Sequence, residues 1–227
     1  MKSSYAQKIM DAPDAPRVIE LLVEAMDAEK RRRDDFRESL NPHTKAEFIN
    51  GHVVIHSPVK SQHWKITDLL SRIVSTYTGL HRLGRVGVEK VMIALERNDY
   101  EPDLVFFSAQ KAAHFTDNQV LFPAPDFVVE ILSKKTAAKD KDIKKRDYAA
   151  NGIAEYWIID PNQQQIEQYI LHNHSTDSQY PAPTIRGIGD RIESHAIPGF
   201  NIPVSAIFDE TSNIETLQGF LTFRRPV

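Results

Sequence analysis

Two carboxylates stand where this sequence predicts buried strands. Asp103 follows Pro102 and opens the apolar run of residues 104–107, and Glu130 interrupts the apolar segment 127–132. An ionised carboxylate in such a strand is unfavourable unless it is paired or binds a cation. Two adjacent carboxylates repel each other, and hard oxygen ligands suit Mg²⁺ or Mn²⁺. We therefore predict that Asp103 and Glu130 bind a divalent metal. Taken alone, Glu130 could equally reach water or an arginine at the end of its strand.

A second Pro-Asp pair, Pro125-Asp126, competes for the same role. Because side chains alternate along a strand, Asp126 shares a face with Glu130. Four strand residues span about 13 Å, so these two carboxylates are too far apart to share one metal. Asp103 comes from a different strand and can lie beside Glu130.

A polar helix is predicted to follow, from about residue 136 to 151, ending at Gly152. Asp140, Lys144 and Tyr148 recur at i, i+4 and i+8 and so line one face of it. The simplest interpretation is an ordinary solvated Asp–Lys pair. Because this helix directly follows the strand of Glu130, it can also bring Lys144 back toward the carboxylates.

Composition excludes several classes of site. The chain has 227 residues, no Cys and a formal charge of −3. Disulfide scaffolds, thiolate zinc sites, iron–sulfur clusters and cysteine nucleophiles are therefore excluded. The sequence also lacks a phosphate-binding P-loop, a dinucleotide-binding glycine motif and a Gly-x-Ser-x-Gly elbow.

Charge is distributed unevenly along the chain. The acidic total does not indicate a nucleic-acid-binding protein. Residues 133–148, however, carry seven Lys or Arg against three Asp, a balance of +4 that leaves −7 for the rest of the chain. A basic helix beside an acidic metal site suits a phosphate substrate.

The remaining pattern mixes helices and strands. We expect a loose arm over residues 1–15, a helix from Pro16 to Leu40, and a hairpin of residues 47–49 and 53–55 around Asn50-Gly51. The further expected elements are a helix over 60–78, strands over 85–89, 91–95, 103–108, 127–132, 155–159 and 166–170, a loop over 171–190, a short strand after Phe200 and a helix over 212–222.

This order of elements predicts an α/β fold. We divide the chain into an N-terminal arm and helical extension, residues 1–44, and a domain of residues 45–227. No segment approaches the length of a membrane span, and the first residues lack a secretory signal, so a cytoplasmic location is expected.

Several motifs together resemble the Uma-type restriction-endonuclease family, which is placed in the PD-(D/E)xK nuclease superfamily. The resemblance covers about residues 45–207 and depends on the order of its motifs. These are residues 47–51, Pro58 with His63, Pro102-Asp103, residues 125–133, Asp140 with Lys144, Tyr148, residues 152–161 and residues 197–200.

The resemblance implies a restriction-endonuclease-like core, a mixed central β-sheet flanked by helices, with metal at one edge. It assigns the metal to Asp103 and Glu130. The superfamily's Lys, two residues after the acid, is Leu132 here, and the Uma-type pattern instead matches Lys144 on the following helix. Glu47 matches a further acid of the family. We interpret His63 first as a packed, hydrogen-bonded histidine and second as a ligand.

The resulting hypothesis is Mg²⁺-dependent hydrolysis of a DNA phosphodiester, with Mn²⁺ able to replace Mg²⁺. Asp103, Glu130 and Lys144 would be the catalytic residues, the Ile131 carbonyl a third metal ligand, and Asp140 and Tyr148 would position Lys144. A protein of this fold that binds DNA or a protein partner without cutting is the alternative, and RNA or branched DNA is a further possible substrate. A homodimer is expected, because cutting two strands requires two sites, with the Pro16–Leu40 helix as the expected contact.

Overall fold

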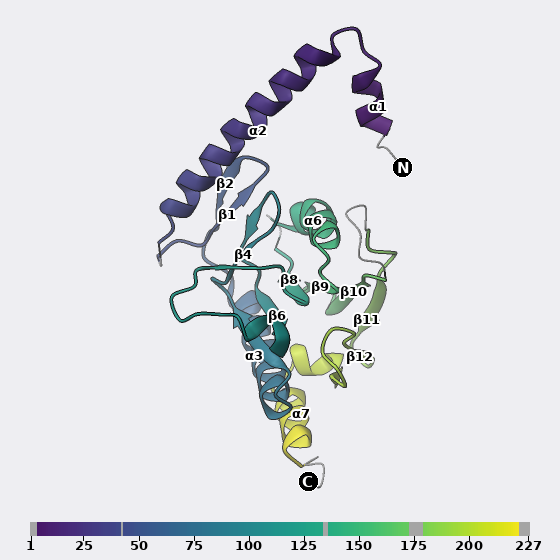
Figure 1. The fold of residues 1–227 in the computed structure, drawn as a ribbon. Coiled ribbons are helices and arrows are strands. Elements are labelled where there is room, and N and C mark those ends of the chain that lie inside the picture. The colour runs from purple at the N-terminus through teal and green to yellow at the C-terminus, as the bar shows by residue number, and fades with distance from the viewer. Residues whose placement is uncertain (1–3, 42, 134–135, 173–178, 223–227) are drawn as a thin grey trace. The chain divides into compact units, whose positions relative to one another are not determined.

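The computed structural model describes residues 4–41, 43–133, 136–172 and 179–222 (Figure 1). By its internal contacts the chain divides into two compact units, Met1–His56 and Ser57–Val227. The domain boundary after residue 44 stays a prediction. No helix within the described ranges is long and apolar enough to cross a membrane.

The first unit consists of two helices and a hairpin. Helix α1 occupies Ser4–Met10, α2 occupies Ala15–Glu38, and strands β1 (Ala46–Ile49) and β2 (His52–Ile55) pair antiparallel. Asn50 and Gly51 both have positive φ, 48° and 82°, which is the requirement of the tight turn that their sequence predicts. The Phe36 and Phe48 rings, 5.8 Å apart, join α2 to this hairpin.

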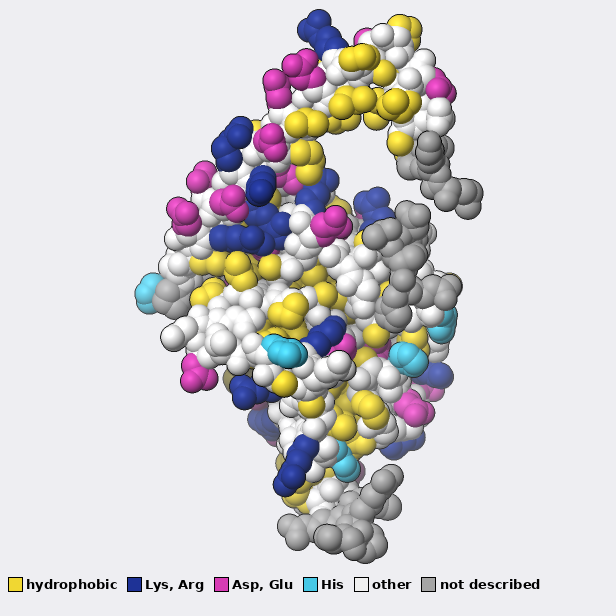
Figure 2. All heavy atoms as spheres, in the orientation of Figure 1, with side chains coloured by type: hydrophobic (Ala, Val, Ile, Leu, Met, Phe, Trp, Pro, Cys, Tyr) yellow, Lys and Arg dark blue, Asp and Glu magenta, His cyan; other side chains and the backbone are white. Residues whose placement is uncertain are grey.

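Helix α2 leaves much of its apolar surface exposed. Leu21, Leu22, Val23 and Met26 are each about half exposed, and the surface of this helix carries a row of hydrophobic side chains in Figure 2. The predicted helix over residues 16–40 is confirmed. The predicted loose arm is wrong for residues 4–10, which form α1, because Ala6, Gln7, Lys8 and Met10 all favour a helix.

The second unit is built on a mixed sheet with the strand order β11-β10-β9-β8-β6-β3. Strands β8 and β9 are parallel, and the other neighbours in it are antiparallel. Strand β4 pairs antiparallel with β5 and parallel with β7. The strands are β3 (Gly84–Val88), β4 (Met92–Ala94), β5 (Asp99–Tyr100), β6 (Leu104–Ser108), β7 (Leu121–Phe122), β8 (Phe127–Ile131), β9 (Glu155–Asp160), β10 (Gln165–Ile170), β11 (Thr184–Gly187), β12 (Arg191–Glu193) and β13 (Asn201–Pro203).

Helices cover this sheet. Helix α3 packs beside α7, and α6 lies near β8 and β9 (Figure 1). The helical segments are α3 (Ser61–Leu80), α4 (Ala109–Ala112), α5 (Ala137–Lys139), η1 (Asp140–Lys144), α6 (Lys145–Ala150), η2 (Val204–Ile207) and α7 (Glu210–Thr222).

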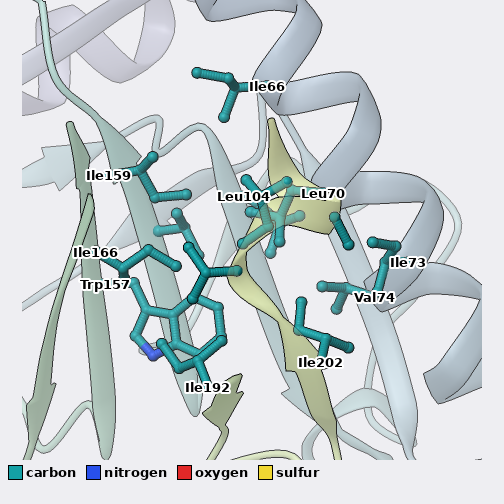
Figure 3. Close-up of a cluster of buried hydrophobic side chains, with 14 of the residues drawn as sticks. Ile66, Leu70, Ile73, Val74, Leu104, Trp157, Ile159, Ile166, Ile192 and Ile202 are labelled. Atoms are coloured by element: carbon teal, nitrogen blue, oxygen red, sulfur yellow. The ribbon is translucent and has the colours of Figure 1, made fainter. Parts of the chain in front are cut away.

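One continuous core joins α3 to the sheet (Figure 3). The buried side of α3 carries Ile66, Leu70, Ile73 and Val74, at the i, i+4, i+7, i+8 spacing of an amphipathic helix. These side chains meet one face of the strands, where alternate residues point inward. From β6, β8 and β9 that face presents Leu104, Phe106, Phe127, Val129, Ile131, Trp157 and Ile159. Glu130 therefore lies on the opposite face of β8.

Most of the expected elements are confirmed within the described ranges, and besides the N-terminal arm there are two corrections. The loop predicted over residues 171–190 contains β11, which pairs with β10 as an edge strand although Pro183 and Gly187 border it. An edge strand tolerates such residues because one side of it needs no partner. Residues 173–178 of that expected loop lie outside the described residues. The predicted helix over 136–151 is helical from 137 to 150, but η1 within it is a π-helix.

Candidate active site

Three acids stand in line across the ends of β3, β6 and β8. Val88 pairs with Leu104, and Leu104 pairs with Val129. Extending both registers by one residue places Glu89, Asp103 and Glu130 opposite one another. The backbone agrees, because Glu89 N donates to Asp103 O at 3.1 Å and Ile131 N donates to the Asp103 carboxylate at 2.8 Å. Sheet pairing therefore creates the acidic end of the sheet that the sequence predicted for Asp103 and Glu130.

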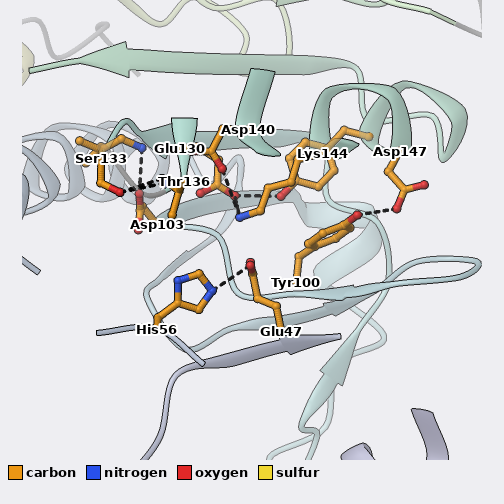
Figure 4. A network of polar contacts seen from close by, with 12 residues as sticks. Glu47, His56, Tyr100, Asp103, Glu130, Ser133, Thr136, Asp140, Lys144 and Asp147 are labelled. Atoms are coloured by element: carbon orange, nitrogen blue, oxygen red, sulfur yellow. Dashed lines mark hydrogen bonds and ion pairs between the residues drawn. The ribbon is translucent and has the colours of Figure 1, made fainter. Parts of the chain in front are cut away.

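Lys144 lies beside Glu130 in the interior (Figure 4). Its Nζ is 2.8 Å from Glu130 Oε1 and 3.6 Å from Asp140 Oδ1, and Lys144 is only 2% exposed. The hydroxyl of Tyr148 donates to the same Glu130 oxygen at 2.9 Å. Asp140, Lys144 and Tyr148 thus converge on Glu130, and the alternative of a solvated Asp–Lys pair on an exposed helix is wrong for these buried side chains.

The π-helix turn η1 carries this convergence. Asp140 begins the turn and Lys144 ends it, and both are buried. A π-turn inserted in an α-helix is rare and recurs at functional sites, because it rotates side chains away from their regular α-helical positions. The π-helix turn therefore lies in the segment that contributes the Lys144 ammonium group to the site.

Buried tyrosines line the Lys144 side of the site. The Lys144 ammonium is 5.6 Å from the Tyr100 ring centre, and Tyr100 donates to Asp147 Oδ2 at 2.7 Å. Burial and then the Asp147 charge raise the pKa of Tyr100 far above its ordinary value. Burial, followed by the charges of Glu130 and Asp140, likewise raises the pKa of Tyr156. Both phenols therefore stay neutral hydrogen-bond donors at ordinary pH.

On its other side Asp103 meets a histidine and a second acid. His63 Nε2 lies 3.2 Å from Asp103 Oδ1, and ligand atoms of His63, Glu89 and Asp103 all lie within 4.8 Å of one another. The side chains of His63 and Asp103 are 12% and 5% exposed. His63 Nε2 is buried without a hydrogen bond of acceptable geometry. Oxygen and imidazole donors at this spacing fit a divalent metal.

Glu89 is the residue that sequence reasoning missed. We assigned it to the strand over residues 85–89, but β3 ends at Val88, and Glu89 and Lys90 turn with φ of 52° and 26°. Two expected strands separated by Lys90 alone do signal a tight turn. Its position opposite Asp103 depends on the pairing of β3 with β6, which no local pattern shows.

The other acids weighed from the sequence lie elsewhere. Asp126 accepts a hydrogen bond from Ser108 N at 2.7 Å and pairs with Lys111 at 2.9 Å, at the opposite end of β8. Glu47, on β1 of the first unit, lies 2.9 Å from His56 Nε2. Its membership of the site stays a prediction.

In the basic segment, Lys141 pairs with Glu167 and Arg146 with Asp142, and Lys134 and Lys135 lie outside the described residues.

Comparisons with known proteins identify the family of this chain. The sequence profile of the Uma2 family, described as "Putative restriction endonuclease", matches residues 33–205. The uncharacterized protein sll1609 of Synechocystis is 29% identical over 129 residues, which cover 55% of this chain and 71% of that protein. The family resemblance seen in the motifs is therefore confirmed.

A solved structure shows the same fold. A "putative nuclease belonging to DUF820" from Anabaena variabilis superposes with a TM-score of 0.66 at 16% identity, over 79% of this chain and 97% of that one. The predicted α/β, restriction-endonuclease-like fold is thus confirmed. The type IIG restriction endonuclease BpuSI matches at a TM-score of 0.35 over 18% of its length, which is too distant to support an inference.

Proposed function

The chain belongs to the Uma2 family, and on this premise we propose that it is a metal-dependent endonuclease that hydrolyses DNA phosphodiester bonds. The single observation that carries the proposal is the buried ion pair of Lys144 and Glu130, 2.8 Å apart, with Asp103 immediately before the neighbouring strand β6. A cation, two carboxylates and a neighbouring basic helix together form a site for a charged phosphate.

The expected ion is Mg²⁺, with Mn²⁺ able to replace it, and Asp103 and Glu130 would hold it. A bound divalent ion polarises the scissile phosphate and lowers the pKa of a bound water. Lys144 would orient the attacking water and offset the negative charge that develops on the phosphate. Asp140 and Tyr148 would hold Lys144 and Glu130 in position through the contacts at 3.6 Å and 2.9 Å.

Asp103→Asn should abolish plasmid nicking in the presence of Mg²⁺ or Mn²⁺, because it removes a charged ligand while keeping the shape of the side chain. The matched control is Asp126→Asn, which also follows a proline at the border of a strand and should retain cleavage. Equal nicking by the wild type and Asp103→Asn would show that the activity belongs to a contaminant or to another site.

A fold of this kind that binds without cutting is the second candidate. The observation in its favour is Leu132, which occupies the place of the superfamily's Lys. Calorimetry with Mn²⁺ separates the two functions. Uptake that depends on Asp103 and Glu130 supports the nuclease, and no uptake by the folded wild type supports the binding protein.

The expected homodimer stays a prediction, as does a cytoplasmic location. We propose α2 as the contact between the two subunits, because it exposes the apolar side chains of Leu21, Leu22, Val23 and Met26. Analytical ultracentrifugation of the wild type and of a Leu22→Glu, Met26→Glu double variant tests it.

A further inference from the structure

We infer that His63 and Glu89 join Asp103 as ligands of the divalent ion, and that the imidazole of His63 makes the site bind Mn²⁺ more tightly than Mg²⁺. This inference deepens the proposed nuclease function and rests on it only for the role of the ion in DNA cleavage. The set of ligands follows from the positions of the three side chains. The 4.8 Å limit on the separations among the three ligand atoms is compatible with their sharing one ion.

Each residue is delivered by a different element, which makes the cluster specific to the folded chain. His63 lies in the first turn of α3, Glu89 in the turn after β3, and Asp103 immediately before β6. The Glu89 backbone is fixed to Asp103 by its 3.1 Å hydrogen bond, so the turn cannot move its carboxylate far from the strand. The site is thus built by rigid elements rather than by a loose acidic surface.

The state of His63 is the second, independent observation. Its Nε2 is buried and lies 3.2 Å from Asp103 Oδ1, yet the angle between them does not allow a hydrogen bond. A buried polar atom without a partner is unfavourable by about 1–3 kcal/mol. Coordination of a cation between His63 and the two carboxylates would satisfy this atom.

The donor set also selects the ion. Mg²⁺ prefers oxygen ligands and water, whereas imidazole suits first-row transition metals. Two carboxylates and one imidazole therefore favour Mn²⁺ over Mg²⁺. This preference depends on His63, so replacing the imidazole with an oxygen donor should reduce it.

The test measures Mn²⁺ binding to the full chain without DNA. Binding is monitored by the loss of the free-ion signal in electron paramagnetic resonance, and competition with Mg²⁺ gives the preference between the two ions. His63→Ala and Glu89→Gln should each weaken Mn²⁺ binding about tenfold or more, because even outer partners of metal ligands contribute that much. His63→Asp should reduce the excess of Mg²⁺ needed to displace Mn²⁺. The exposed His114→Ala and Glu215→Gln are matched controls and should bind as the wild type does.

Circular dichroism melting shows whether each variant folds. Wild-type Mn²⁺ affinity in folded His63→Ala, or in folded Glu89→Gln, would overturn this ligand set. The proposed function fails differently: a wild type that binds Mn²⁺ through these residues but cuts no DNA would sink the nuclease and leave the metal site in place.

Discussion

The two ends of the central sheet hold buried carboxylates in opposite ways. At one end, Glu155 on β9 accepts four hydrogen bonds from neutral donors: Trp157 Nε1 at 2.6 Å, Gln168 Nε2 at 2.7 Å, Ser194 Oγ at 2.6 Å and Ala196 N at 2.9 Å. At the other end, Glu89, Asp103 and Glu130 lie side by side with His63 and Lys144. Because β8 and β9 run parallel and Glu155 pairs with Phe127, these two clusters lie at opposite ends.

This difference distinguishes Glu155, a carboxylate that stabilises the fold, from the carboxylates that are proposed to bind metal. Each carboxylate oxygen of Glu155 accepts two hydrogen bonds. Those from Ser194 and Ala196 connect β9 to the segment that leads into β13. At the acidic end like charges gather and one imidazole nitrogen lacks a hydrogen bond. Buried polar networks stabilise a fold when every member is satisfied. At the acidic end, by contrast, the buried His63 Nε2 is not satisfied, and the proposed cation would satisfy it.

Glu155→Ala should have the largest effect on stability. It leaves four buried donors without an acceptor and opens a cavity beside Trp157, so we expect a loss on the order of 5 kcal/mol in the free energy of unfolding. Urea unfolding followed by circular dichroism measures it. Glu155→Gln, which keeps one acceptor oxygen, should lose less. A variant within about 1 kcal/mol of the wild type would contradict the structural role assigned to Glu155.

Lys144→Met should have the next largest effect, because it leaves Glu130 and Asp140 in the interior without their cation. Breaking a buried ion pair from one side costs about 3 kcal/mol or more, and replacing both partners is often nearly neutral. The double variant Lys144→Met, Glu130→Gln should therefore recover much of the lost stability but none of the cleavage. Recovery of cleavage by the double variant would remove Lys144 from the proposed mechanism.

Features that depend on local sequence could be predicted, whereas positions that depend on strand pairing and helix packing could not. Local patterns are enough for α3, whose apolar spacing shows its buried side, and for the turn at Asn50-Gly51. The meeting of Asp103 with Glu130 was predictable because Asp103 opens one apolar strand and Glu130 interrupts another. Glu89 and His63 were not assigned to the site, because their places depend on the pairing of β3 with β6 and on how α3 packs. The π-turn at 140–144 has no sequence signal that we recognise.

The smallest expected effect concerns Tyr156 on β9, whose ring lies 5.0 Å from that of Tyr148 and whose hydroxyl donates to Asp140 O at 3.3 Å. Its pKa is raised in the folded chain, so the folded state keeps the phenol neutral while the unfolded chain ionises it near pH 10. The stability that this contributes is present below about pH 10 and is lost as the pH rises further.

Tyr156→Phe should therefore be less stable than the wild type by about 1 kcal/mol at pH 8, where only the hydrogen bond is missing. Between about pH 10 and 11 its free energy of unfolding should fall less steeply, by up to about 1.4 kcal/mol per pH unit, so the two proteins converge. Comparing the two slopes removes the contribution of lysines, which both proteins share. Tyr5, which is 76% exposed, supplies the control: Tyr5→Phe should change neither value. Parallel curves for the wild type and Tyr156→Phe would mean that neither burial nor the Glu130 and Asp140 charges raise the pKa of Tyr156, and this part of the site would then be less buried than its contacts indicate.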